Sequence, residues 1–208
     1  MSETKRWEGP HVDAWSAAWT PEQVAAALKG VAAPWALAGG WAVDLWLGRQ
    51  TRAHEDTEIT IPHGDFPQVR ERLESLGLKV FDNHNAEVTR LPPGAAPAGE
   101  FQTWVSDAEE TGWLLDVFRE PGDAETWVCR RSDKIRAPLS WANRSTDAGI
   151  PYVAPQIVLL FKAKHQRDKD LADFELVAPR LEPDARAWLA NALQLIHPGH
   201  PWIDRLAG

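Results

Sequence analysis

The stretch of sequence that decides the fold runs from Gly39 to Ile61 and reads GGWAVDLWLGRQTRAHEDTEITI. Two glycines come before a helical pattern that ends at Gly48, a residue type that commonly closes a helix. Acidic residues follow, where the chain changes to the alternating pattern of a β-strand. The stretch therefore predicts a strand-to-helix turn with an exposed backbone, followed by a strand that carries charge on one face.

The glycine pair follows the apolar run 35–38, which predicts a buried strand leading into a helix over about 41–47. Backbone amides at a helix N-terminus, with no Cβ in the way, form a site for phosphate, and Gly39 and Gly40 provide such a turn. The alternative is a tight turn that needs only a positive φ. The glycine pair alone does not decide between the two.

The acidic residues lie on one face of the next predicted strand. Asp56, Glu58 and Thr60 share that face because side chains alternate along a strand. Carboxylates two residues apart lie about 7 Å from each other and can converge on metal ions. Like charges at this spacing are unfavourable without a cation near them, and magnesium, with its preference for oxygen ligands, phosphates and water, suits the position. The alternative is a solvated edge strand.

A third acid, Asp116, lies in the apolar run WLLDVF at residues 113–118. Apolar residues on both of its faces predict a central strand that is covered on both sides. An ionised carboxylate in such a strand is costly unless it is paired or bound to a metal. Together with Asp56 and Glu58, this residue describes a two-metal centre for phosphoryl transfer, whereas alone it would only cap a strand end.

The rest of the chain predicts an α+β protein. Helices are expected near residues 20–30 and 65–76, the latter with Val69, Leu73 and Leu76 facing inward, and strands near 79–81, 87–91 and 126–129. From residue 154 the pattern is helical, with one long helix over 154–177 and another over 182–196. We expect a core of mixed strands and helices over residues 1–150 and a C-terminal helical region over 151–208.

Composition narrows the class of protein. The chain has 208 residues and a net charge of −8, which argues against a nucleic-acid groove and fits a cationic partner. The single cysteine, Cys129, excludes an intramolecular disulfide and is expected to be buried. Twelve tryptophans favour core packing over a stacking surface. No run reaches membrane-spanning length and the N-terminus lacks a signal-peptide pattern, which predicts a cytoplasmic protein without a membrane partner.

The residues GGWAVDLWLGRQTRAHEDTEI resemble the signature of the aminoglycoside and lincosamide nucleotidyltransferases, within the polymerase-beta-like superfamily. The later segments GIPYVAPQIVLLFKAK and RDKDLADF resemble uncharacterised members of that group. The resemblance covers about Trp35 to Leu181, apart from residues 91–110. It implies a nucleotidyltransferase core, a mixed β-sheet flanked by helices, with a C-terminal helical region that closes the cleft.

The resemblance also implies roles for single residues. Gly39 and Gly40 would bind the β- and γ-phosphates of a nucleotide. Asp56 and Glu58 would hold two magnesium ions, and Asp116 would be a further metal ligand that accepts the proton of the substrate hydroxyl. Thr57 departs from the family pattern, which usually has a bulky aliphatic residue between the two acids.

Residues near the first motif have two interpretations each. Arg52 would neutralise triphosphate charge or form a surface salt bridge, and His54 would orient a ligand or make a structural hydrogen bond. Asp44 is interpreted as structural, bonded within the loop at Thr51 and Arg52.

The polar stripe of the 154–177 helix also leaves two interpretations open. With the resemblance, Lys162 or Lys164 would reach the nucleotide phosphates while Asp170 and Asp173 line the cleft and contact the substrate. Without it, the stripe is a solvated face with a pair between Lys169 and Asp173. The arginines at 130 and 131 are lesser phosphate-binding candidates.

These observations predict a magnesium-dependent nucleotidyltransferase that moves a nucleoside monophosphate, AMP in the first place, from ATP or another NTP to a hydroxyl group. The acceptor implied by the resemblance is a small antibiotic, an aminoglycoside or a lincosamide, and pyrophosphate is released. An inactive nucleotide- or ligand-binding protein on the same fold is the alternative, and a tryptophan-lined carbohydrate-binding module is a third hypothesis. The sequence specifies neither the acceptor, the preferred NTP nor the oligomeric state.

Overall fold

A computed structural model describes residues 15, 17–84 and 87–207. The N-terminal segment, for which the sequence predicts no signal peptide, lies outside the described residues. Among the helices of the described part of the chain, none is both long and apolar enough to cross a membrane.

Eight strands form one mixed β-sheet in the order β4-β3-β5-β6-β2-β1-β10-β9. The pairs β2–β6 and β1–β10 are parallel and the other neighbours are antiparallel. The strands are β1 (Ala36–Leu37), β2 (Glu58–Pro62), β3 (Lys79–His84), β4 (Glu87–Arg90), β5 (Gln102–Ser106), β6 (Trp113–Glu120), β9 (Asn143–Ser145) and β10 (Pro151–Val153). A separate antiparallel pair consists of β7 (Thr126–Val128) and β8 (Arg136–Pro138).

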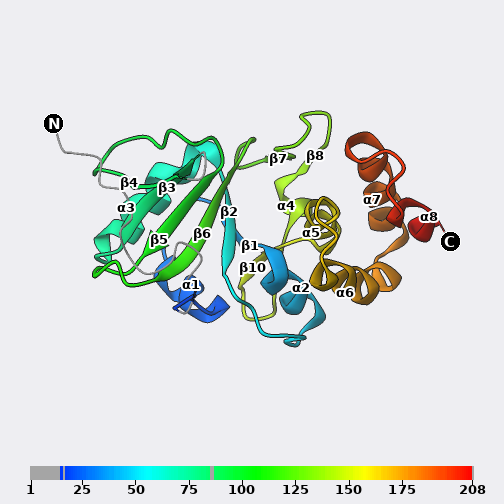
Figure 1. Ribbon diagram of the computed structural model, residues 1–208, viewed down its shortest axis with the longest axis horizontal. Helices are drawn as coiled ribbons and strands as arrows, with labels where there is room; N and C mark the ends of the chain where they lie inside the picture. Colours follow the sequence, from blue (N-terminus) through cyan, green and yellow to red (C-terminus); the bar gives the residue numbers. More distant parts are fainter. Residues whose placement is uncertain (1–14, 16, 85–86, 208) are drawn as a thin grey trace.

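Helices flank this sheet and make up the C-terminal part, which confirms the α+β fold. They are α1 (Pro21–Ala27), α2 (Gly39–Leu47), α3 (Phe66–Ser75), α4 (Leu139–Ala142), α5 (Pro155–Lys162), α6 (Asp168–Val177), α7 (Pro183–Ile196) and α8 (Trp202–Ala207), with short 3-10 turns at His63–Asp65 and Ala178–Arg180. Figure 1 shows α5 to α8 at one end of the molecule and β3 to β6 at the other, with β1, β2 and β10 between them. Since β10 pairs with β1, the sheet continues past residue 150.

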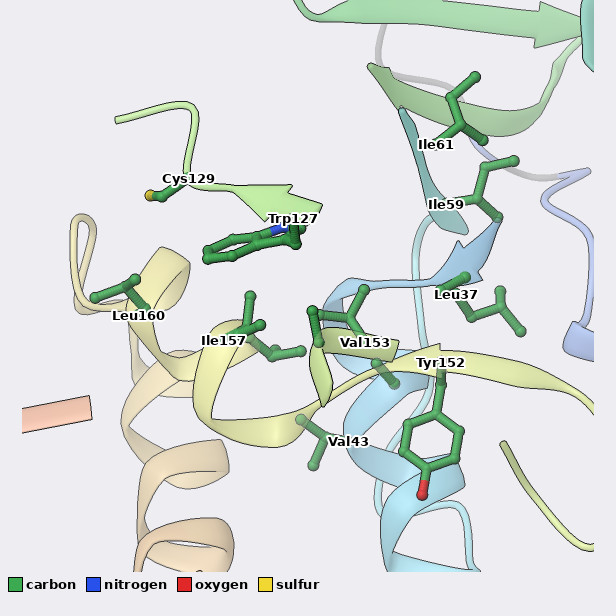
Figure 2. Packing of buried hydrophobic residues seen from close by; sticks show 14 of the residues in the cluster. Leu37, Val43, Ile59, Ile61, Trp127, Cys129, Tyr152, Val153, Ile157 and Leu160 are labelled. Carbon is green, nitrogen blue, oxygen red and sulfur yellow. The ribbon is translucent and has the colours of Figure 1, made fainter. Parts of the chain in front are cut away.

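One cluster of buried apolar residues joins the sheet to the C-terminal helices. Figure 2 shows Leu37 of β1 and Ile59 of β2 on one side of it, and Trp127 of β7 with Ile157 of α5 on the other. Cys129 lies in the same cluster and is only 1% exposed, which confirms its prediction as a buried residue. The shared core fixes the helical part against the strands.

The predicted helix ends follow the local rules closely. Thr20 and Gln23 form a capping box at the start of α1, and Gly48 ends α2 in the left-handed conformation. Helix α2 begins at Gly39, two residues earlier than expected.

The inward position predicted for Leu76 is wrong: α3 ends at Ser75, and Leu76 is 44% exposed.

The single long helix predicted over residues 154–177 is also wrong. The structure has α5 and α6, joined by a turn over residues 163–167, and Gln166 in that turn has a φ of +49°. Apolar residues on both sides of the turn pack on the same core, which made the two helices look like one pattern, whereas residues 164–170 are all polar and mark the break.

The strand predicted to carry Asp56 and Glu58 is shorter at its start than expected. Strand β2 begins at Glu58, and Asp56 precedes it instead of sharing its face. The first ladder hydrogen bond on this side runs from Asp116 N to Thr57 O at 2.8 Å, and the Thr57 hydroxyl donates to Trp19 O. The backbone therefore enters the sheet only at Thr57. Strand β5 was not predicted at all.

Candidate active site

Two carboxylates lie side by side at the centre of the sheet. Glu58 of β2 and Asp116 of β6 are direct partners in the parallel register, and we call them the strand acids. Paired residues on neighbouring strands point to the same face about 5 Å apart. Asp116 is 5% exposed, and Gln102 Nε2 of β5 donates to Asp116 Oδ2 at 2.6 Å. Asp116 Oδ1 forms no hydrogen bond of normal geometry to another described residue, although the indole of Trp104, its partner on β5, acts to lower the Asp116 pKa.

The strand acids repel each other in a site with little water. Burial and the nearby charge of Asp56 raise the pKa of Glu58 to about 7. Burial and the charge of Glu58 hold the pKa of Asp116 well above its usual range, against the hydrogen bond from Gln102. Among the described residues, neither strand acid forms an ion pair with a Lys or Arg side chain, so no cation in contact offsets the repulsion. A cation between them would relieve the repulsion.

The glycine pair lets charged side chains approach the first turn of α2. Gly39 has a φ of +58°, and a Cβ there would overlap the carboxylate of Glu58. A Cβ on Gly40 would overlap the guanidinium of Arg52 and the ring of His54. The turn therefore brings α2 into contact with both strand β2 and the loop that precedes it. Both glycines are required by close approach, and Gly39 also by its conformation.

The loop before β2 is fixed to α2 through Asp44. This buried carboxylate accepts hydrogen bonds from Thr51 N at 3.1 Å and Thr51 Oγ1 at 2.5 Å, which confirms its structural interpretation. His54 Nε2 lies 2.5 Å from the other oxygen, Asp44 Oδ2, and the His54 ring packs on Trp41 with 4.3 Å between ring centroids. His54 thus has the structural contacts of its second interpretation.

A cavity of about 560 Å³ opens over the face of β2 and β6 that carries Glu58. This volume is within the range of small-molecule sites. Five of its lining residues are Lys or Arg and two are acidic, although the chain as a whole carries a net charge of −8. The charged lining residues are Glu58, Glu120, Arg130, Arg131, Lys162, Lys164 and Arg167, and Gly39 also lines the cavity. The cavity concentrates positive charge beside the strand acids.

Two buried acids of α6 hold the lysine at the end of α5. Lys162 Nζ lies 3.3 Å from Asp170 Oδ1 and 2.8 Å from Asp173 Oδ2, and we call Asp170 and Asp173 the helix acids. They are 0% and 2% exposed and are not among the cavity-lining residues, so the structure places them behind Lys162. The pair between Lys169 and Asp173 is not formed; Lys169 instead contacts Glu55 at 2.9 Å.

Arg130 is fixed in the cavity wall. Its guanidinium is ion-paired with Glu120 and stacks over the rings of Phe118 and Phe161, at 4.4 and 4.2 Å from their centroids. Its neighbour Arg131 donates to the carbonyl oxygen of Phe161 at 3.1 Å. Both arginines therefore present fixed positive charge to the space beside the sheet.

Sequence patterns missed part of this site. Gln102 was missed because β5 was not predicted, although Thr103, Trp104 and Val105 are strand-forming residues between a glycine and an aspartate. Arg167 was missed because the turn that aims it at the cavity was taken for helix interior. The aromatic wall at Phe118, Trp127 and Phe161 has no local signal, since those residues also look like ordinary core residues.

The donor chemistry fits a divalent cation at the strand acids. Both carry carboxylate oxygens, which magnesium prefers, and Asp116 Oδ1 is buried without a hydrogen bond of normal geometry to another described residue. Among those same residues, no group of three or more His, Cys, Asp or Glu side chains is gathered as a complete metal cage. Magnesium is commonly held by one or two carboxylates together with substrate phosphates, so a pair of acids is a sufficient protein contribution.

Comparisons with known proteins find a family that matches part of the chain. Residues 22–95 match the model of a family described as aminoglycoside-2''-adenylyltransferase. A 2''-aminoglycoside nucleotidyltransferase from Klebsiella pneumoniae is 38% identical over 60 residues, which are 29% of this chain and 34% of that protein. These matches make the segment around the two glycines and the first acids similar to that family. The aligned region spans only about a third of the length of that relative.

Solved structures extend the likeness to the fold of most of the chain. The solution structure of ANT(2'')-Ia has a TM-score of 0.54 and 16% identity, and covers 84% of this chain and 89% of that one. ANT(2'')-Ia in complex with adenylyl-2''-tobramycin gives 0.55 and 16%, covering 84% and 95%. The lincosamide adenylyltransferase LnuA with bound lincomycin gives 0.51 and 20%, covering 74% and 91%. At these identities the likeness establishes the fold.

Proposed function

We propose that this protein transfers a nucleoside monophosphate from an NTP, with ATP as the first candidate, to a hydroxyl group of a small acceptor, and releases pyrophosphate. The observation that carries the proposal is the juxtaposition of Glu58 and Asp116 at the edge of a cavity whose charged lining is mostly basic. The two acids repel each other, and five basic side chains line the cavity beside them. A magnesium-bound triphosphate would supply a cation to the acids and negative charge to the basic side chains.

The triphosphate would lie between α2 and α5. Lys162 and Lys164 line the cavity with Gly39, and α2 directs the amides of its first turn toward the same space. Arg52, which lies against Gly40, would add positive charge there. The C-terminal helices would close the cleft over the nucleotide, since α5 provides the lysines.

In the transfer step, the acceptor oxygen forms a bond to the α-phosphorus. The bond between that phosphorus and the oxygen that bridges to the β-phosphorus breaks, and the electron pair leaves with pyrophosphate. The hydroxyl proton passes to the carboxylate of Asp116, which Gln102 holds in orientation. The raised pKa of Asp116 favours proton acceptance by its ionised form.

The strand acids, with Asp56 just before β2, would hold the magnesium. The ion supplies positive charge that offsets the charge developing on the phosphates. The residues of the chain bind, orient and shield the reactants from water. The two-ion arrangement implied by the resemblance remains part of this proposal.

A small antibiotic is the proposed acceptor. One relative is named as a 2''-aminoglycoside nucleotidyltransferase, and the lincosamide adenylyltransferase LnuA was solved with lincomycin bound. The net charge of −8 is favourable for a cationic acceptor. The proposed role is antibiotic modification in the cytoplasm.

The test is release of pyrophosphate from ATP or GTP with magnesium, measured against a panel of aminoglycosides and lincosamides. Acceptor-dependent release is expected from the wild-type protein. Asp56→Asn and Glu58→Gln should each reduce it by about 10³-fold or more while far-UV circular dichroism stays unchanged. Turnover retained in both variants would refute the assignment.

Glu55→Gln is the matched control, because it removes one charge from the same segment and its side chain is 82% exposed. Its activity should stay within about threefold of wild type. Magnesium-dependent nucleotide binding without release would instead support a binding protein. The observation that favours this second candidate is that Asp116 is buried behind Gln102 and does not line the cavity.

A further inference from the structure

Charged groups from three segments of the chain meet between α2 and α6. Asp173 Oδ2 lies 2.8 Å from Lys162 Nζ and 3.4 Å from Arg52 Nη2, so one carboxylate oxygen contacts two cations. Asp170 supports the cluster, accepting from Arg167 N and Nε at 3.1 and 2.9 Å while it also contacts Lys162. The helix acids are almost fully buried, whereas the Arg52 side chain is 26% exposed.

This cluster depends on the break between the two helices. In a continuous helix, Lys162 and Asp173 would be separated by about 16 Å along the axis, at 1.5 Å per residue. The turn over residues 163–167 folds α6 back, and the side chains come within 2.8 Å. The contact is therefore a tertiary one, and it is not the i to i+4 pairing of a solvated helix face.

Of the two cations held by Asp173, Lys162 lines the cavity proposed for the triphosphate, and Arg52 lies outside that lining, against the first turn of α2. Lys162 lines the cavity with Gly39 and Glu58, and its charge acts to lower the pKa of Glu58. Arg52 Nη2, the atom that contacts Asp173, is also the guanidinium atom that a Cβ on Gly40 would overlap. Asp173 thus connects α6 to the lysine of α5 and to the first turn of α2.

We propose that Asp173, supported by Asp170, is a positioning residue that holds Lys162 and Arg52 in place for the phosphates of the bound nucleotide. This inference rests on the proposed function, since it names how that site binds its nucleotide. It also gives the helix acids a role that differs from direct contact with the substrate.

Two physical effects of Asp173 oppose each other, so the sign of the change is informative. Its negative charge competes with phosphate for the two cations, and removing it would strengthen nucleotide binding. Its fixed geometry spares Lys162 and Arg52 the loss of side-chain freedom on binding, and removing it would weaken nucleotide binding. The positioning role predicts that the second effect is larger, because burial fixes the carboxylate in one place.

The experiment is calorimetric titration of each protein with ATP and magnesium, without acceptor. Asp173→Asn should raise the Kd about tenfold in the wild-type background. In a protein that already carries Lys162→Met and Arg52→Met, the same substitution should change the Kd less than twofold, because the groups through which it acts are gone. An equal loss in both backgrounds, or tighter binding in the single variant, would overturn the positioning role.

Two further variants separate positioning from loss of folding. Asp173→Glu keeps the charge and should recover most of the affinity if Asp173→Asn folds poorly. Glu175→Gln, on the same helix, breaks an exposed ion pair with Arg205 and should change the Kd less than twofold. A Glu175→Gln protein that loses as much affinity as Asp173→Asn would show that the effect belongs to α6 as a whole, against the proposal.

Deuterium exchange without nucleotide tests the positioning role directly, and the ATP titrations separate it from the proposed function. Asp173→Asn should increase uptake in residues 51–57, while Glu175→Gln should not. If the wild-type protein binds no ATP with magnesium, the proposed function fails and the positioning role fails with it. If the wild-type protein binds and Asp173→Asn binds equally well, only the positioning role is overturned.

Discussion

The strand acids and the helix acids are two pairs of buried carboxylates with opposite surroundings. Glu58 of β2 and Asp116 of β6 lie side by side on one face of the sheet, and both have a raised pKa. Asp170 and Asp173 are at least as buried, yet each contacts Lys162 directly. Burial alone would raise the pKa of Asp170, but the hydrogen bond from Arg167 and the charge of Lys162 outweigh it and leave the pKa lowered.

This difference separates acids that are paired within the fold from acids for which we propose a bound cation. A buried carboxylate with its cations in place contributes to the structure, and removing it leaves those cations unpaired. Ionising a buried carboxylate next to another one is unfavourable, and the rest of the fold must offset this cost. Such arrangements are typical of functional sites. The distinction predicts opposite responses to the same substitution in the two pairs.

The largest expected effect is on stability without divalent ions. Asp170→Asn should lower the free energy of unfolding by about 3 kcal/mol, because Lys162 and Arg167 lose a buried partner. Asp116→Asn should raise it by about 1 kcal/mol at pH 8, because repulsion with Glu58 is removed. Urea denaturation measures both, with Asp168→Asn as an exposed control on α6 that should stay within about 0.5 kcal/mol of wild type. Changes of the same sign in the two buried variants would contradict the comparison.

A smaller effect is expected from pH, again without divalent ions. The pKa of Glu58 is about 7 in the folded protein against a model value of 4.5, so the folded state holds this proton more tightly. Its contribution to stability is complete below about pH 4.5 and is lost as the pH rises through 7, a decrease on the order of 1–3 kcal/mol. Asp170 behaves in the opposite way, since its lowered pKa gives stability above its unfolded pKa that is lost in acid.

The measurement is the unfolding free energy of wild type and Glu58→Gln between pH 5 and 8. The difference between the two curves should grow with pH in favour of the variant. A difference that does not change across this range would show that Glu58 is ionised throughout, and would remove the electrostatic argument for the strand acids.

The smallest effect expected is from magnesium alone. At 10 mM, an ion with a Kd of about 1 mM stabilises the folded state by about 1.4 kcal/mol, which corresponds to a rise in Tm of roughly 3–5 °C. Glu58→Gln should lose this rise, whereas Asp170→Asn should keep it despite its lower starting Tm. Sodium chloride at matched ionic strength is the control. An equal rise in all three proteins would indicate a non-specific ion effect.

Local patterns were sufficient for the strand acids and for the turn at Gly39. Alternation placed Glu58 on the open face of its strand, and the apolar run around Asp116 indicated a central strand, which the register between β2 and β6 confirms. The helix start at Thr20 and the helix stop at Gly48 follow from caps that involve only neighbouring residues. These features need a few consecutive residues and no distant partner.

The features that sequence reasoning missed depend on distant partners. Asp56 falls before β2 because the loop is fixed to Asp44 and α6. Gln102 reaches Asp116 only because β5 pairs with β6. The helix acids have the spacing of a solvated stripe, and only the fold shows that they face Lys162. Side-chain pairing across the fold is not visible in a local period.

The left-handed residue at Gln166 has a consequence for how this protein tolerates change. A φ of +49° at a residue other than glycine is unfavourable, so the backbone gives up some stability to make this turn. A single inserted residue within 163–167 would change the length and direction of this turn, and with them the approach of α6 to Lys162, while leaving every charged residue in the sequence. The contact between Lys162 and the helix acids therefore depends on the length of this turn as well as on the charged residues.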